Sequence, residues 1–305
     1  MKKKFSPVLL AILIIQILFV FRNSIPILMD TASHEPVTAP QVTVPPSNPD
    51  PAAPAKKMDK NFSALDSSLR YAALSSKQKK IYKAMQKAVA QHSTFVGIDQ
   101  EFIEEREFLE VLDVFWYTDP TLLAAGGLKN ERIYQITSQN RVLSVKFQYA
   151  LNKKTIKKYV KSTRKQVKKI VRETDGMNDW DKAKYFHDYL ILHATYSTML
   201  AEKANHSAYN CLVSGYCVCD GYAKAYKLLC DKAQIPCEIV TGKVDGVGHA
   251  WNLVQINGVW YHMDVTFDDP VGMPEDYIDY QYFCLTTEEI LRDHVIDPEA
   301  NFPMP

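Results

Sequence analysis

The first apolar stretch of the chain lies directly behind a basic N-terminus. Residues 5–21 read FSPVLLAILIIQILFVF, and MKKK precedes them. A basic flank followed by an apolar run of this length is typical of a signal peptide or a signal anchor, and about 20 such residues cross a bilayer. Because no small-x-small cleavage motif follows at the usual distance, residues 1–24 are predicted to form a signal anchor, with a cleaved signal peptide as the alternative.

The segment that follows changes from apolar to proline-rich. From residue 32 to residue 57 proline and alanine dominate, and large apolar side chains are almost absent. Such a segment cannot bury enough surface to fold, so residues 25–57 are predicted to be a semi-extended linker. The lysines behind the initiator methionine would keep the N-terminus inside. We therefore expect a single-pass protein of the cell membrane with its folded part outside, or alternatively a secreted protein.

Residues 58–177 alternate between helical and extended patterns and are predicted to form an accessory α+β region. Within residues 75–91, Ile81, Met85 and Val89 recur at four-residue spacing, which predicts an amphipathic helix. The pieces VLDVFWYTD (111–119) and RVLSVKFQYAL (141–151) predict strands. Residues 155–173 predict a second amphipathic helix, whose polar side is basic. We interpret that side as a solvated face, with contact to anionic lipid or wall polymer as the alternative.

The clearest element of residues 178–305 is a turn signal between two apolar runs. Asn257 and Gly258 separate GHAWNLVQI from VWYHMDVTF, which is a strong signature of a two-residue hairpin. With these residues as the turn, His249 and Asp264 lie on one face as diagonal neighbours, with Cβ atoms about 7 Å apart. The opposite face is mostly apolar and should pack on the core. A slip of one residue would separate the pair.

A carboxylate beside a histidine is half of a catalytic unit, because it fixes the tautomer and stabilises the imidazolium. The candidate nucleophile lies in CVCDGYA (217–223), where a helix is predicted to begin. Cys219 stands at the helix start, where the dipole and the unpaired N–H groups favour a thiolate, and Cys217 stands in the extended segment before it. Asp268 and Asp269 are alternatives to Asp264 as the orienting carboxylate. A buried structural thiol and a core histidine are the non-catalytic alternatives.

Charge and cysteine content narrow the function only slightly. The formal net charge is +1, which does not indicate a polyanionic partner, and no nucleic-acid binding is predicted. All six cysteines lie in the last third of the chain without a CxxC pair, so no metal site is predicted. A zinc site remains an alternative, and its ligands would be Cys217, Cys219, His249 and His262. Most of the other cysteines are expected to be buried thiols, with Cys230 and Cys237 as the one candidate disulfide.

Three segments together resemble the transglutaminase-like superfamily, in particular its bacterial extracytoplasmic members. They are HSAYNCLVSGYCVCDGYAKAYKLL, GHAWNLVQINGVWYHMDVTFDDP and YQYFCLTTEEILRDH, and FHDYLILHATY resembles the lead-in helix of the family. For residues 178–305 the resemblance implies a papain-like α+β core, with an antiparallel sheet packed on the cysteine helix. Carried over position by position, it implies a triad of Cys219, His249 and Asp264. It implies neither a metal nor a cofactor.

Two places depart from the family pattern. Asn210 and Cys211 stand where a small Gly-Ala-like pair is often found, and Phe267 stands where tryptophan is usual. Neither departure is expected to touch the triad, although the first would alter the rim of the site.

The implied activity is that of a cysteine enzyme that forms a thioester with carboxamide or peptide groups of proteins or peptides, cell-wall peptides included. The sequence does not choose between transfer to an amine and hydrolysis, because both reactions share one acyl-enzyme. Tyr216, Tyr222 and Trp251 are expected to line the substrate cleft, with a place in the core as the alternative. The alternative function is a non-catalytic module that binds a peptide or wall polymer in the same cleft.

Overall fold

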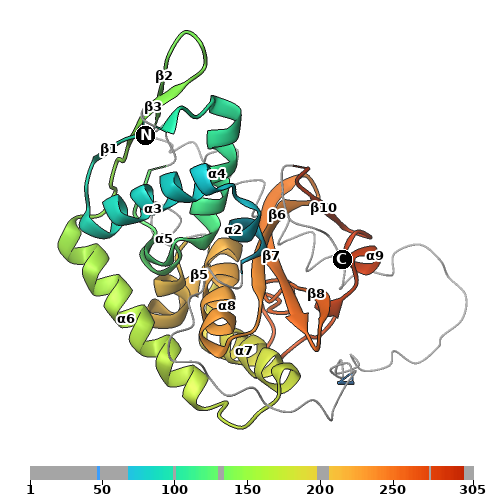
Figure 1. The fold of residues 1–305 in the computed structure, drawn as a ribbon. Coiled ribbons are helices and arrows are strands. Elements are labelled where there is room, and N and C mark those ends of the chain that lie inside the picture. The colour runs from blue at the N-terminus through green and yellow to red at the C-terminus, as the bar shows by residue number, and fades with distance from the viewer. Residues whose placement is uncertain are drawn as a thin grey trace, which may run out of the picture.

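The computed structural model describes residues 47–48, 68–98, 101–129, 134–197, 206–274 and 276–298. The expected anchor at 1–24 and almost all of the expected linker at 25–57 lie outside these residues. Within the described residues, no helix combines the length and the apolar character that crossing a membrane requires. Helices and small sheets alternate along the described part, so the predicted mixed α/β character of the fold is confirmed (Figure 1).

Four of the described helices and a small antiparallel sheet precede residue 150. The helices are α2 (Leu69–Ala73), α3 (Ser76–Gln91), α4 (Glu105–Thr118) and α5 (Pro120–Ala125). The sheet has the order β1 (Phe95–Gly97), β3 (Val142–Lys146) and β2 (Tyr134–Ile136). The helix predicted at 75–91 is confirmed as α3. Its residues Ile81, Met85 and Val89 are buried, and a capping box between Ser75 and Gln78 begins it.

The strand predicted at 111–119 is wrong, because residues 111–118 belong to α4. The apolar residues Phe108, Val111 and Phe115 follow each other at spacings of three and four, and all are buried in one core. This helical period begins before residue 111, so the β-favouring piece reads as a strand only when it is taken alone. The strand predicted at 141–151 is confirmed for the five residues of β3.

The helix predicted at 155–173 is confirmed as α6 (Lys153–Arg172). Asn152 begins it, and its side chain accepts a hydrogen bond of 2.9 Å from the N–H of Thr155. Ile156, Val167 and Ile170 are buried, and the helix packs on α5 and α8. The predicted basic side is exposed to solvent, and it consists of Lys157, Lys158, Lys161, Arg164, Lys165, Lys168 and Arg172.

The remaining described elements form the part of the fold that holds the candidate site. The helical elements are α7 (Asp179–His193), which is capped by Asn178, η2 (Asn210–Ser214), α8 (Cys219–Ala233) and α9 (Thr287–Ile290). β4 (Thr195–Tyr196) and β5 (Tyr216–Cys217) pair in parallel. A five-stranded antiparallel sheet has the order β10 (His294–Ile296), β6 (Cys237–Val244), β7 (Val247–Ile256), β8 (Val259–Met263) and β9 (Phe283–Leu285).

The hairpin of β7 and β8 has the predicted register. Ile256 pairs with Val259, and the two residues between them form the turn. Asn257 has a φ of 53° and Gly258 a φ of 87°, which are the left-handed values that a two-residue hairpin turn needs. The predicted core face of β7 packs on α8, where the side-chain amide of Asn252 donates to a main-chain carbonyl of the helix at 3.0 Å.

Helix α8 lies between the sheet and the helices of the N-terminal part (Figure 1). Its own contacts are with β6 and β7 on one side and with α5 and α6 on another. The short helix α2 attaches the N-terminal part to the five-stranded sheet, because the N–H of Leu69 donates to Glu238 of β6 at 2.6 Å. The buried guanidinium of Arg70 donates to the carbonyl of Ile239 at 2.9 Å and to Asp113 of α4 at 2.6 Å. Helix α8 is therefore packed between strands and helices, and α2 links β6 to α4.

Candidate active site

The two cysteines near the start of α8 lie in different surroundings. Cys217 ends β5 and is fully buried, and burial, followed by its hydrogen bond with Cys211, raises the pKa of its thiol far above the usual range. Cys219 is the first residue of α8 and is partly exposed. The first N–H groups of a helix have no partner within the helix, and the helix dipole is positive there. Cys219 therefore combines access with a position at the start of a helix, whereas Cys217 is buried.

His249 of β7 lies between Cys219 and Asp264. Its Nε2 is 2.5 Å from Oδ2 of Asp264, which directly follows β8. The side chain of Cys219 also acts on this imidazole, because it adds to the rise in the pKa of His249. The side chain of His249 is 9% exposed and that of Asp264 is not exposed at all, so little water reaches their contact. The predicted proximity of the histidine and the carboxylate is confirmed, and the catalytic role of the three residues stays a prediction.

The electrostatic environment favours an ion pair between His249 and Asp264. Burial by itself disfavours the imidazolium, but the carboxylate of Asp264 and then the side chain of Cys219 raise the pKa of His249 to about 10. Burial alone would raise the pKa of Asp264, but the charge and hydrogen bond of His249, together with the hydrogen bond of His294, hold it well below the usual range. At neutral pH, Asp264 is therefore ionised and His249 protonated.

The carboxylate of Asp264 accepts hydrogen bonds on both oxygens. Oδ1 accepts from the main-chain N–H groups of Thr266 and Phe267 at 3.0 and 3.3 Å. Oδ2 lies 2.5 Å from Nε2 of His249 and 3.0 Å from Nε2 of His294. These contacts fix the orientation of the carboxylate. Sequence reasoning missed His294, although this histidine ends the motif YQYFCLTTEEILRDH, and that position was the available signal.

One of the two departures from the family pattern does contact the site, contrary to expectation. The ring of Phe267 packs edge-on against His249, with centroids 5.0 Å apart and an interplanar angle of 67°. The same ring lies 5.1 Å from that of His294. Phe267 therefore shields the imidazole of His249 from solvent. Cys211, at the other departure, is buried beside Cys217.

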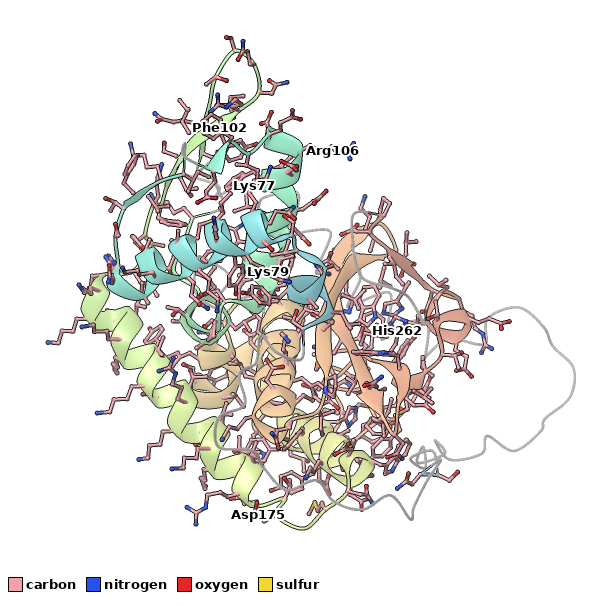
Figure 2. All side chains as sticks on the ribbon, viewed as in Figure 1. Lys77, Lys79, Phe102, Arg106, Asp175 and His262 are labelled. Carbon is pink, nitrogen blue, oxygen red and sulfur yellow. The ribbon has the colours of Figure 1, made fainter. Side chains whose placement is uncertain are left out.

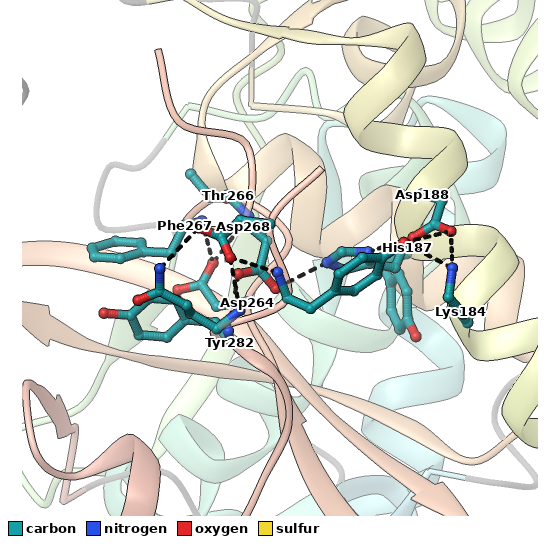
Figure 3. A network of polar contacts seen from close by, with 12 residues as sticks. Lys184, His187, Asp188, Asp264, Thr266, Phe267, Asp268 and Tyr282 are labelled. Carbon is teal, nitrogen blue, oxygen red and sulfur yellow. Dashed lines mark hydrogen bonds and ion pairs between the residues drawn. The ribbon is translucent and has the colours of Figure 1, made fainter. Parts of the chain in front are cut away.

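The two alternative carboxylates bind other residues. Oδ2 of Asp268 lies 3.0 Å from Nε2 of His187, a buried residue of α7 (Figure 3). Oδ2 of Asp269 accepts a hydrogen bond of 2.5 Å from the hydroxyl of Tyr222. Of the three carboxylates proposed from the sequence, Asp264 is the one that is hydrogen-bonded to His249.

A cavity of about 500 Å³ has Tyr196, Tyr216 and Asp269 in its wall, whereas Cys219, His249 and Asp264 do not line it. Tyr196 connects it to the site, because the charges of Cys219 and Asp264 add to burial in raising the pKa of this tyrosine. Loop residues 270–274 form another part of the wall. Tyr196 is therefore the wall residue whose surroundings include the candidate nucleophile, and sequence reasoning missed it.

The predicted cleft residues differ in their positions. Tyr216 is 48% exposed and lines the cavity, whereas Tyr222 and Trp251 are each 1% exposed and do not line it. Tyr222 supports the wall from behind through Asp269. The indole of Trp251 donates to Nδ1 of His262 at 2.9 Å. Figure 2 marks the position of His262 at the sheet. Burial, followed by the charge of a neighbouring histidine, lowers the pKa of His262 to about 4, so this ring is neutral and accepts.

Among the described residues, one group has the spacing to hold a metal ion. His249, Asp264 and His294 each offer a ligand atom, and these atoms lie within 4.8 Å of one another. The hydrogen bonds to the carboxylate already account for this spacing. The alternative zinc set from the sequence does not converge in the described part, because His262 is turned to Trp251 and to a threonine hydroxyl.

All six cysteines are free thiols, so the candidate disulfide between Cys230 and Cys237 is not formed in the structure. The two side chains are buried and hydrogen-bonded to each other. Burial, followed by this hydrogen bond, raises the pKa of Cys230 far above the usual range. The expectation that these residues pack as buried thiols agrees with this arrangement.

Comparison with known proteins identifies the class of this domain. Residues 164–265 match the family model of the transglutaminase-like superfamily. The chain therefore carries a transglutaminase-like domain, and the resemblance found in the sequence is confirmed.

Individual relatives are distant. Human kyphoscoliosis peptidase is 24% identical over 143 residues, and the match covers 40% of this chain and 22% of that protein. The chain thus spans about a fifth of the length of this curated relative. A candidate cysteine protease from Cytophaga hutchinsonii has a TM-score of 0.32 at 20% identity, covering 44% of this chain and 41% of its own. A TGase structure has a TM-score of 0.31 at 18% identity, covering 47% and 45%.

Proposed function

We propose that the chain is a transglutaminase-like cysteine enzyme that forms a thioester on Cys219. The observation that carries the proposal is the position of His249, which is hydrogen-bonded to the Asp264 carboxylate and near enough to Cys219 for that side chain to raise its pKa. An imidazole held in this way can take a proton from the thiol and later return it to a leaving amine. The membership of the domain in the transglutaminase-like superfamily supports the same reaction class.

The proposed reaction has two halves. First, the sulfur of Cys219 attacks the carbonyl carbon of a carboxamide or peptide group. The C–N bond breaks, the amine leaves with the proton from His249, and the acyl group remains on sulfur as a thioester. Next, an amine or water attacks the thioester and gives its proton to His249, and the thiolate is restored. An amine yields a new amide, and water yields a carboxylic acid.

The negative oxygen of each tetrahedral intermediate would lie at the start of α8. The first N–H groups of that helix have no helical acceptor, so they are suitable donors to an oxyanion. The main-chain N–H of Cys219 is the donor that we propose. The buried Asp264 would keep His249 in place and stabilise its protonated form throughout the cycle.

The proposed substrate is a carboxamide or peptide group of a protein or peptide, cell-wall peptides included. The cavity with Tyr196 and Tyr216 in its wall offers space for the neighbouring residues of such a chain. We place the reaction outside the cytoplasmic membrane, and this proposal rests on the basic and apolar N-terminal sequence alone. The proposal needs no cofactor and no nucleic acid.

The rival proposal is a module that binds a peptide or wall polymer in the same cavity without reacting. The full chain in detergent is incubated with pooled wall peptides and protein substrates, and intact mass and amine release are followed. Cys219→Ala should abolish both the mass increase of the acyl-enzyme and turnover. Cys217→Ala is the matched control and should retain most of the activity, because the Cys217 thiol is buried. Binding without any mass increase supports the rival, and equal loss in both variants contradicts the role of Cys219.

A further inference from the structure

Two histidines share the carboxylate of Asp264. Its Oδ2 lies 2.5 Å from Nε2 of His249 and 3.0 Å from Nε2 of His294. His294 is 30 residues further along the chain and belongs to the edge strand β10. The two imidazole rings have centroids 5.6 Å apart and planes inclined at 62°, so they do not stack. The second histidine is therefore a separate partner of the carboxylate, and it has no part in the proposed triad.

Contacts on every side hold His294 in this orientation. Its Nδ1 lies 2.6 Å from Oδ1 of Asp293, and Oδ2 of Asp293 accepts the hydroxyl of Tyr282 at 2.6 Å. The rings of Trp251 and Phe267 lie against it, with centroids 5.0 and 5.1 Å away. His294 is 1% exposed. The ring therefore cannot turn away from Asp264 without breaking a buried polar contact at its other end.

The approach of β10 depends on a glycine in the neighbouring strand. A Cβ at Gly242 of β6 would lie 2.0 Å from the carbonyl oxygen of Val295 and 2.9 Å from the ring of Trp251. Any side chain at this position would therefore push β10, and His294 with it, away from Asp264. The pairing of β10 with β6 therefore fixes the contact between His294 and the carboxylate of Asp264.

Both nitrogens of His294 face carboxylate oxygens, Nε2 that of Asp264 and Nδ1 that of Asp293. The charge of His294 adds to burial in lowering the pKa of His262 to about 4. The titratable groups that face this ring are Asp264, Asp293, His249, His262 and Tyr282.

We propose that His294 is a positioning residue, which fixes Asp264 against His249 and offsets part of the carboxylate's charge. The inference rests on the proposed function, because it concerns the proton that His249 must return to a leaving amine. A carboxylate with no second partner would hold the imidazolium of His249 more firmly, and proton return to the amine would be slower. His294 thus influences both how firmly His249 holds its proton and how readily His249 releases that proton to the leaving amine.

Two variants separate the hydrogen bond of His294 from its charge. In His294→Gln the amide nitrogen can occupy the place of Nε2 and donate to Asp264 without a charge. In His294→Asn the amide reaches only the place of Nδ1, and the donor to Asp264 is lost. A positioned general acid–base contributes about 10²–10⁴-fold, and we expect His294→Asn to lose part of this, with kcat falling about 10–100-fold and KM little changed. His294→Gln should keep most of kcat at its optimum, while the basic limb of its kcat/KM profile moves to higher pH.

The result that overturns the inference is a profile unmoved in both variants. Unchanged turnover in His294→Asn would mean that the contact with Asp264 does not affect the reaction. Equal losses of kcat in both variants, in parallel with a fall in thermal midpoint, would mean that His294 serves only the fold. Formation of the acyl-enzyme in the unaltered chain is measured first, by intact mass. Its absence contradicts the proposed function and the role of His294 with it. If the acyl-enzyme forms but the pH profiles do not differ, the result contradicts only the role of His294 and leaves the proposed function standing.

Discussion

Replacing Asp268 by asparagine should weaken the fold while leaving the proposed reaction intact. Asp268 and His187 are both fully buried, and Oδ2 of the carboxylate lies 3.0 Å from Nε2 of the imidazole. The other oxygen of Asp268 accepts the N–H of Tyr282 at 2.9 Å. Figure 3 shows how these contacts connect α7 to the loop that follows Asp264. The pair therefore joins two elements that are far apart in the sequence.

The expected magnitude follows from the charge of His187. Its Nδ1 lies 3.0 Å from Asp188 and its Nε2 faces Asp268, so burial lowers its pKa but the two carboxylates raise it above the usual value. The change Asp268→Asn would leave the imidazolium with one carboxylate. Removing one partner of a buried ion pair costs about 3–5 kcal/mol. Because an amide oxygen can still accept the N–H of Tyr282, we expect a loss of about 3 kcal/mol, at the lower end of that range.

Urea unfolding followed by tryptophan fluorescence measures this loss, which should lower the midpoint without changing the slope. Asp188→Asn is the matched control, because the Asp188 side chain is 20% exposed and its loss should be smaller. A double-variant cycle of His187→Gln and Asp268→Asn should give a coupling energy of about 0.5–3 kcal/mol. An unchanged urea midpoint with strongly reduced turnover would refute the reasoning, because Asp268 would then be an orienting carboxylate of the site.

Three further predictions concern the site, the pH dependence and the N-terminus. Asp264→Asn should fold but lower kcat, by up to about 10⁴-fold if the loss matches that of a serine triad; steady-state kinetics with circular dichroism measure it, and an unchanged kcat would contradict the proposed role. The stability that His187 gains from its carboxylates should be complete below its unfolded pKa of about 6.5 and be lost as pH rises through its higher folded pKa. The difference in urea midpoint between the unaltered chain and His187→Gln should therefore shrink at alkaline pH, and a growing difference would contradict the ion pair. A chain shortened to begin at Lys60 should be soluble and as active per molecule as the full chain, because the described helices and strands all follow it; insolubility would show that earlier residues belong to the fold.

The parts of the site that the sequence predicted have local causes. Asn257 and Gly258 tolerate the positive φ of a hairpin turn, so the turn could be located from two residues. Side-chain alternation then placed His249 and Asp264 on one face. The helix start at Cys219 was also readable, because the apolar period of α8 begins immediately after it.

The errors arise where a pattern is compatible with two environments. Trp251 was expected at the cleft, but α9 covers that face of the sheet, and the indole packs with Leu253 and Ile290 in a small core. An aromatic residue on a strand looks the same in the sequence whether a ligand or a helix covers it. The strand expected at 111–119 has the same cause, because a short β-favouring piece lies within a longer helical period.

The contacts that sequence reasoning could not supply join residues far apart in the chain. His187 and Asp268 are separated by 81 residues, and His294 and Asp264 by 30. No local period or turn signal relates such positions, since the sheet order and the packing of α7 decide them. The position of His294 at the end of a recognised motif is the signal that could have marked it as a candidate site residue. Its partner Asp264 can be identified only from the structure, in which β10 pairs with β6.

Asp264 and Asp268 show why the spacing of a histidine and a carboxylate does not by itself predict a catalytic pair. Both acids lie in one turn, where the N–H of Asp268 donates to the carbonyl of Asp264 at 3.2 Å, and each holds a buried imidazole. The pairs differ in the third group that reaches the imidazole. His187 has a second carboxylate on its other nitrogen, which fills both hydrogen-bonding sites and leaves no place for a reacting group. His249 instead has the side chain of the partly exposed Cys219 near it, so a reacting group can reach this imidazole. The cysteine at the helix start, rather than the acid, therefore distinguishes the candidate catalytic pair from the structural one.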